Sequence, residues 1–216
     1  MLKGISISKS YGDLNVLKDV DIEVERGEMV SIVGKSGTGK STLLHILGSL
    51  DRADFGEVII EGNSIQNLNQ KQLAAFRNEK IGFVFQFHHL LAEFNALENV
   101  CIPAFIKGTE RKVAEHKAEE LLEYLGLKDR MHHKPSQMSG GEQQRVAVAR
   151  SLINSPSIVF ADEPTGNLDN ATSDEMHSLF LSLKKDFNQT FVIVTHNADL
   201  ASMSDRKLEM IGGKLV

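Results

Sequence analysis

The chain has 216 residues, of which 41% are apolar and 25% are charged, with 17 glycines and 4 prolines. This globular composition excludes a disordered tail, a collagen-like repeat and a disulfide-stapled mini-protein. A net charge of −5 gives no positive field for nucleic-acid binding, and the single cysteine, Cys101, cannot form an internal disulfide. No apolar run reaches the ~20 residues of a membrane span, and the N-terminus has no apolar signal core. We therefore expect a soluble cytosolic protein with no nucleic-acid partner and no membrane span.

Short strands and helices alternate along most of the predicted secondary structure. Before residue 90 the patterns predict a helix over residues 41–50 and strands over 20–24, 29–33, 58–60 and 81–85. After residue 152 they predict helices over 170–187 and 197–203 and strands over 158–161, 191–194 and 207–211. Helices alternating with buried strands favour an α/β fold with a mainly parallel sheet.

Residues 95–152 have a different, helical character. Within them Val113, Leu121, Leu122 and Leu125 are predicted to share one apolar helix face. We predict a single domain over residues 1–216, with an α/β core at 1–86 and 153–216. An α-helical subdomain is then inserted over about residues 87–152.

Residues 34–41 read GKSGTGKS and fit the phosphate-loop pattern G-x-x-x-x-G-K-[ST]. The glycines let successive N–H groups turn toward phosphate oxygens, and the following helix start adds its dipole. We expect Lys40 between the β- and γ-phosphates and the Ser41 hydroxyl on Mg²⁺. A glycine-rich turn without a ligand is the alternative, but a preceding strand and a following helix are the context that this motif needs.

An apolar strand over residues 158–161 ends in two acids, Asp162 and Glu163. Beside a phosphate loop, Asp162 is placed to hold Mg²⁺ and Glu163 to polarise the attacking water. The alternative is a strand that simply ends in solvated acids. A Ras-type GTPase is disfavoured because the chain has no Asn-Lys-x-Asp stretch to read guanine.

Residues 139–145 read SGGEQQR and allow two compatible interpretations. Ser139 and Glu142 have the spacing of a capping box, while the two glycines leave N–H groups free for an anion. The stretch resembles the signature motif of the ABC ATPase family, Leu-Ser-Gly-Gly-Gln, with Met138 for the leucine and Glu142 for the glutamine. Further family motifs follow in order, so the resemblance covers the whole chain.

The resemblance assigns roles to residues that would otherwise be read as ordinary surface or structural side chains. It implies that Tyr11 stacks on adenine, Gln86 contacts Mg²⁺ and water, Asp169 crosses a dimer interface and His196 contacts the γ-phosphate. The nucleotide-binding set it implies is Tyr11, Val16, Gly34, Lys35, Ser36, Gly37, Thr38, Gly39, Lys40, Ser41, Thr42, Ser139, Gly140, Gly141, Glu142 and Asp169. The catalytic set is Glu163, His196 and Gln86, and the metal set is Ser41, Gln86 and Asp162.

Fold and partners are also implied by the resemblance. It implies a P-loop NTPase core with an N-terminal antiparallel β region and an α-helical subdomain. It further implies an ATPase homodimer, in which residues 34–41 of one copy and 139–142 of the other sandwich each ATP. Two integral membrane permease subunits would dock near Gln86–Val100, at the cytoplasmic face of the inner membrane. A local packing role for residues 87–100 stays open.

Within the family, stretches such as ADEPTGNLD at residues 161–169 are similar to the ATPases of lipoprotein-releasing systems. The ATPases of macrolide exporters and of the FtsE cell-division complex share much of this sequence and stay open as alternatives. Non-transport members are disfavoured, because the chain holds one cassette and no long coiled coil between Lys40 and Ser139. A P-loop kinase would not explain residues 139–143.

Overall fold

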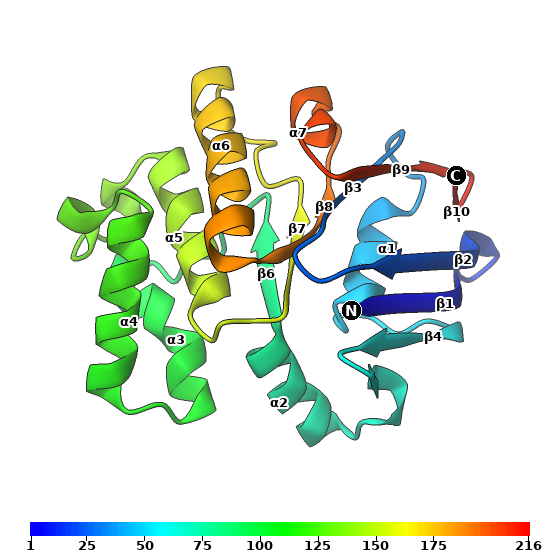
Figure 1. Cartoon of the computed structure of the whole chain (residues 1–216), viewed down its shortest axis with the longest axis horizontal. Coiled ribbons are helices and arrows are strands. Elements are labelled where there is room, and N and C mark those ends of the chain that lie inside the picture. Colours follow the sequence, from blue (N-terminus) through cyan, green and yellow to red (C-terminus); the bar gives the residue numbers. More distant parts are fainter.

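The computed structural model describes all residues from 1 to 216 and has the α/β architecture shown in Figure 1. The strands are β1 (Leu2–Tyr11), β2 (Leu14–Val24), β3 (Met29–Val33), β4 (Phe55–Ile60), β5 (Asn63–Ser64), β6 (Ile81–Phe85), β7 (Ile158–Asp162), β8 (Thr190–Val194), β9 (Arg206–Ile211) and β10 (Lys214–Leu215). The α-helices are α1 (Lys40–Leu47), α2 (Gln70–Lys80), α3 (Ala96–Lys107), α4 (Arg111–Tyr124), α5 (Gly140–Leu152), α6 (Asn170–Phe187) and α7 (Ala198–Ser202). Short 3₁₀ turns are η1 (Ile65–Asn67), η2 (Lys128–Arg130) and η3 (Pro135–Gln137).

Two sheets form the framework. The larger has the order β10-β9-β3-β8-β7-β6, and its strands are parallel except for the terminal β9–β10 hairpin. The smaller, of order β2-β1-β4-β5, is antiparallel and contains the N-terminus. The expected fold class, a mainly parallel core with an antiparallel N-terminal region, is confirmed.

Both faces of the parallel sheet are covered, which explains the continuous apolar runs in its strands. One buried cluster joins α1 and the antiparallel sheet to one face, as Figure 1 shows with α1 beside β1 and β2. A second cluster joins the other face to α3, α4, α5 and α6. Every residue of β8 is buried.

The carboxyl ends of the parallel strands meet at one edge of the sheet. Phe85 of β6 pairs with Asp162 of β7, and Asp162 pairs with Val194 of β8. Val194 lies beside Ile32 of β3, one residue before that strand ends. Open α/β sheets bind ligands at this edge, and the segments that follow β3, β6, β7 and β8 are therefore neighbours.

The segment between β6 and β7 holds α3, α4 and α5, so it is helical as expected. The boundaries of a separate subdomain at residues 87 and 152 stay a prediction. None of the helices combines the length and the apolar character that crossing a bilayer requires.

Several details differ from the sequence expectation, among them strand β1, for which no range was predicted. The prediction for Val113 is wrong: it is exposed, because it lies one residue off the buried row of Ala114, Ala118 and Leu122. Helix α1 ends at Leu47, before the predicted residue 50. Helix α2 was not predicted, because none of its residues is fully buried and only Leu73 and Phe76 pack against the core.

Candidate nucleotide site

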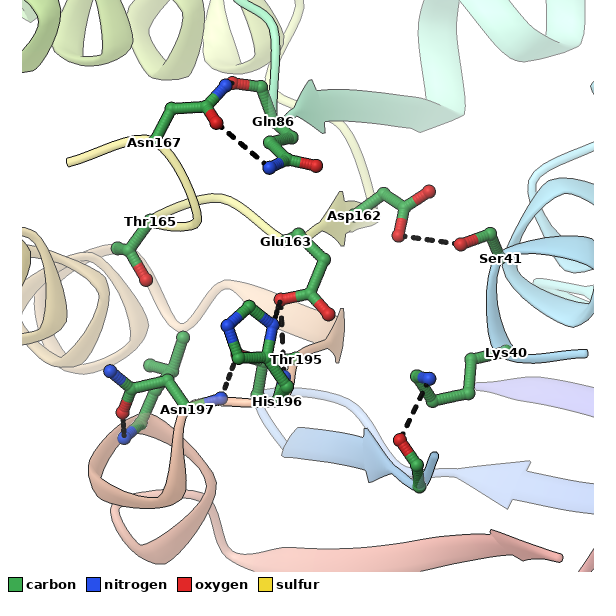
Figure 2. A network of polar contacts seen from close by, with 12 residues as sticks. Lys40, Ser41, Gln86, Asp162, Glu163, Thr165, Asn167, Thr195, His196 and Asn197 are labelled. Atoms are coloured by element: carbon green, nitrogen blue, oxygen red, sulfur yellow. Dashed lines mark hydrogen bonds and ion pairs between the residues drawn. The ribbon is translucent and has the colours of Figure 1, made fainter. Parts of the chain in front are cut away.

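The phosphate loop connects the end of β3 to the start of α1. Gly39 is the N-cap of α1, has φ +102°, and no side chain caps the helix. A Cβ on Gly39 would lie 2.9 Å from Leu17 Cδ2 and 3.0 Å from the carbonyl oxygen of Val16, so only glycine fits. The first N–H groups of α1 therefore remain available to an anion. Lys40 Nζ donates to the carbonyls of Gly34 and Lys35, both at 2.9 Å, and so lies over the loop (Figure 2).

A cleft of about 580 Å³ opens above this loop. Its lining consists of Tyr11, Val16, Gly34, Ser36, Gly37, Gly39, Lys40, Ser41, Thr42, Gln86, Glu163 and His196. Each of these residues belongs to the set proposed from the sequence. A cavity of about 330 Å³ between α1 and α2 contains none of that set, so the chemistry belongs to the larger cleft.

Asp162 and Ser41 bring two oxygen donors together beside the cleft. The Ser41 hydroxyl donates to Asp162 Oδ1 at 3.0 Å, and His45 Nε2 lies 3.7 Å from Asp162 Oδ2. Burial raises the pKa of Asp162, while the Ser41 hydrogen bond and His45 act in the opposite direction. Oxygen donors suit Mg²⁺, and one carboxylate with substrate phosphates is its usual protein environment. The chain has no cluster of three or more acids, histidines or cysteines that could hold a metal by themselves.

Glu163 follows Asp162 in a strained backbone conformation, with φ +47°. Its N–H donates to the carbonyl of Val194 at 2.9 Å. Its Oε2 lies 2.8 Å from His196 Nδ1 and accepts the His196 N–H at 3.2 Å, as Figure 2 shows. The carboxylate is thus fixed at the cleft wall, where it can accept a proton from water.

Gln86 reaches the same cleft from the end of β6. Its Nε2 donates to Asn167 Oδ1 at 3.0 Å, and Asn167 Nδ2 donates to the Gln86 carbonyl at 3.2 Å (Figure 2). Sequence reasoning did not single out Asn167, although it lies in the stretch 164–169 that carries the family resemblance. A contact across 81 positions leaves no signal in the local pattern.

Tyr11, at the end of β1, is held by two residues that the sequence did not indicate. Its hydroxyl donates to Asp51 Oδ2 at 2.6 Å, and Lys9 Nζ lies 5.2 Å from the ring centroid. The hydrogen bond to Asp51 raises the pKa of Tyr11. The ring remains half exposed in the cleft wall, where a base can stack on it.

Residues 139–142, the signature motif, lie outside the phosphate-loop cleft. Ser139 is the N-cap of α5: its N–H donates to Glu142 Oε2 at 2.7 Å, and the Glu142 N–H donates to Ser139 Oγ at 3.2 Å. The predicted capping box is therefore present. The Ser139 N–H, aided by Arg130, lowers the pKa of Glu142.

These residues line a cavity of their own, of about 250 Å³, together with Gly141 and Thr172. Asp169 caps α6 by accepting the Thr172 N–H at 3.0 Å. The structure thus separates Ser139, Gly140, Gly141, Glu142 and Asp169 from the phosphate-loop cleft. Lys35 and Thr38 belong to the loop without lining the cleft, and the Thr38 hydroxyl donates to the Lys35 carbonyl at 2.9 Å.

Comparison with protein families decides what kind of site this is. A family model described as ABC transporter matches residues 17–166. The chain belongs to the ABC transporter family. The expectation drawn from the signature motif is confirmed, and the phosphate loop, Gln86, Asp162 and Ser139 of this ABC chain all fall within the matched residues.

Curated relatives and solved structures extend the match to the whole ABC chain. It is 60% identical over 216 residues to the lipoprotein-releasing system ATP-binding protein LolD of Cytophaga hutchinsonii, covering 100% of this chain and 99% of the relative. It is 55% identical over 210 residues to LolD of Bacteroides fragilis, covering 97% of each. A dimeric post-hydrolysis structure of the ATP-binding cassette MJ0796, bound to ADP and Pi, is similar with a TM-score of 0.90 and 38% identity, covering 100% of this chain and 96% of that one.

Proposed function

We propose that the chain is the ATP-hydrolysing subunit of an ABC transporter that releases lipoproteins from the inner membrane toward the outer membrane. The observation that carries the proposal is one cleft that unites the phosphate loop with Glu163, in a chain 60% identical to a lipoprotein-releasing ATP-binding protein. The similarity to two lipoprotein-releasing relatives favours this function over the macrolide-exporter and cell-division alternatives.

ATP binding follows from the lining of the cleft. The free N–H groups at the start of α1 and the ammonium of Lys40 provide positive charge for the phosphates. Tyr11 offers its ring to adenine, with Val16 and Thr42 beside the nucleotide. Ser41 and Asp162 would hold Mg²⁺, which when bound neutralises charge developing on the phosphate oxygens.

Hydrolysis needs a base near the γ-phosphate. Glu163 is fixed by its contacts with His196 and Val194, so its carboxylate can orient and deprotonate the attacking water without reorganising. His196 holds one oxygen of this carboxylate and faces the cleft, where its ring can reach the γ-phosphate. Gln86 lines the same cleft and would offer its amide oxygen to the metal and to water.

The ATP site is completed by a second copy. In one chain the phosphate loop lines one cavity and the signature turn (residues 139–142) lines another. A single chain therefore cannot bring Ser139 to the phosphates of the ATP bound in its own phosphate loop. A head-to-tail homodimer would place each signature turn, with Asp169, over the partner's phosphate loop. The similar MJ0796 cassette is a dimer. Because the γ-phosphate bridges the two copies, hydrolysis removes a contact and favours opening.

The membrane partner is assigned to the segment after Gln86. Phe87, Leu91 and Phe94 are exposed there, although large apolar side chains are usually buried. We place two permease subunits against this region, from Gln86 to Val100, at the cytoplasmic face of the inner membrane. The opening and closing of the ATPase dimer would then be passed to the transport path.

Glu163→Gln tests the catalytic assignment and the dimer together. It should keep ATP bound and slow hydrolysis by about 10²–10⁴-fold, because the general base is lost. It also removes a negative charge beside the γ-phosphate, so light scattering with Mg²⁺ and ATP should detect a persistent dimer. Near-normal turnover would remove Glu163 from the catalytic role.

Ser139→Arg in that background is the matched test of the second copy. It should dissolve the dimer and leave ATP bound to the monomer, whereas loss of monomer binding would contradict the two-copy site.

The lipoprotein cargo needs a separate test: the chain should co-purify with its membrane subunits and drive ATP-dependent lipoprotein release from proteoliposomes. A protein lacking the lipid anchor is the control, and equal release of both would contradict the lipoprotein assignment.

A further inference from the structure

Gln86 and Asn167 are joined by two reciprocal hydrogen bonds, although 81 positions separate them. Asn167 accepts from the side-chain nitrogen of Gln86 and donates to its main-chain carbonyl, at 3.0 and 3.2 Å. One asparagine therefore fixes both the backbone and the carboxamide of Gln86. The Asn167 side chain makes no other hydrogen bond in the chain, so its polar atoms are devoted to this pair.

This pairing fixes which way the amide of Gln86 faces. Because Nε2 is bound to Asn167, Oε1 is left without a partner and is directed into the site. Figure 2 shows this oxygen on the side where Asp162 and Ser41 lie. Gln86 and Ser41 both line the same cleft. Mg²⁺ prefers oxygen ligands, so only this orientation of the amide offers Gln86 as a ligand.

The neighbouring glycine supports the same geometry. A Cβ on Gly166 would lie 2.9 Å from Gln86 Nε2 and 3.2 Å from Gln86 Cδ. Glycine at 166 therefore lets the carboxamide lie directly on the turn that follows Glu163. The Gly166 N–H donates to the Glu163 carbonyl at 3.0 Å, which ties this turn to the catalytic carboxylate.

We propose that Asn167 is a positioning residue that orients the Gln86 amide oxygen toward the Mg²⁺ site formed by Ser41 and Asp162. The proposal rests on the ATPase function proposed above. Asn167 touches neither substrate nor metal and acts through Gln86. It also ties the segment before α6, which contains Asp169, to the metal side of the cleft.

Manganese affinity tests the proposal without relying on turnover. The Glu163→Gln chain, saturated with ATP, is titrated with Mn²⁺ and followed by electron paramagnetic resonance. Adding Asn167→Ala should weaken Mn²⁺ binding by about 10–100-fold, the usual cost of losing a residue that orients a metal ligand. Asn170→Ala, an exposed asparagine three positions further on, is the matched control and should bind Mn²⁺ like the parent.

A double-mutant cycle shows whether the effect passes through Gln86. In a Gln86→Ala background, Asn167→Ala should cause no further loss of Mn²⁺ affinity. Gly166→Ala, which displaces the amide without altering Asn167, should weaken Mn²⁺ in the wild-type Gln86 background. All variants should bind ATP equally in EDTA, which controls for folding.

The outcomes are separable. A parent chain that binds neither ATP nor Mn²⁺ would overturn the proposed function itself. A parent that binds both, with Asn167→Ala unchanged, would overturn the positioning role alone. If Asn167→Ala lowered Mn²⁺ affinity equally in the Gln86 and Gln86→Ala backgrounds, the positioning role would also be overturned, because Asn167 would then act by another route.

Discussion

Two glycine-containing helix starts, at α1 and at α5, serve the same ligand in the proposed mechanism and are built in opposite ways. At α1 the N-cap is Gly39 in a left-handed conformation, and no side chain caps the helix. At α5 the N-cap Ser139 and Glu142 satisfy each other's N–H groups through a complete capping box. The first leaves its donors free, whereas the second uses them within the chain.

The two helix starts therefore contribute differently to the proposed ATP site. The free donors of α1, with Lys40 above them, form a binding site within one chain. The capped start of α5 is stable without a ligand and offers only a hydroxyl and the remaining N–H groups of its first turn. The signature turn should therefore contribute to dimer closure and to helix stability, and little to ATP capture by a single chain.

Lys40→Ala should have the largest effect, because it removes the cation of the α1 site. Loss of one partner from a desolvated charge pair costs about 2–5 kcal/mol, so tight ATP binding should disappear. Nucleotide titration of the purified variant measures this, with Lys71→Ala, an exposed lysine outside the phosphate loop, as the control. Unchanged ATP affinity would contradict the phosphate-loop assignment.

Tyr11→Ala should weaken ATP binding by about 1–3 kcal/mol if its ring stacks on the base. The affinity for inorganic triphosphate should stay the same, because that ligand has no base. Asp51→Asn keeps the ring but weakens its hydrogen-bonded support, so the ATP affinity of this variant should lie between those of the wild type and Tyr11→Ala. An equal loss for ATP and for triphosphate would show that Tyr11 acts on the phosphates instead.

Ser139→Ala should lower the stability of the protein through the α5 start and leave ATP binding at the α1 start unchanged. Losing the capping hydroxyl should lower the free energy of unfolding by about 1 kcal/mol, measured by chemical denaturation. ATP binding by the monomer should be unchanged, since Ser139 lies in a different cavity from the phosphate loop. A weaker monomer affinity for ATP would show that the α5 start takes part in ATP capture by a single chain.

Glu142→Gln should have the smallest effect, visible as a change in pH dependence. The Ser139 N–H and Arg130 hold the pKa of Glu142 below its ordinary value. The charged form therefore stabilises the fold above the unfolded-state pKa, and this contribution is lost as pH falls through the lower folded-state value. The stability difference between wild type and Glu142→Gln should shrink as pH falls below about 4.3, the ordinary pKa of a glutamate. Denaturation of Glu93→Gln, an exposed glutamate outside the capping box, gives the baseline, and an equal shift there would contradict the prediction.

Parts of the site that are continuous in the chain can be read from local sequence. The phosphate loop, the two acids at the end of β7 and the capping box of α5 each depend on residues only a few positions apart, so local chemistry specifies them. The buried parallel strands β3, β6, β7 and β8 were predicted for the same reason, because their apolar runs are local.

How these parts combine depends on contacts that form only in the folded chain. Two contacts join residues 40 or more positions apart: the hydrogen bond of Tyr11 to Asp51 and the pair of Gln86 with Asn167. The fold likewise places Ser139 in a cavity separate from the phosphate loop. Val113 was misplaced because a one-residue shift moves a side chain about 100° around a helix, and only packing against neighbours selects the buried row. A local pattern records which residues can be buried or bind, whereas the fold determines which of them meet.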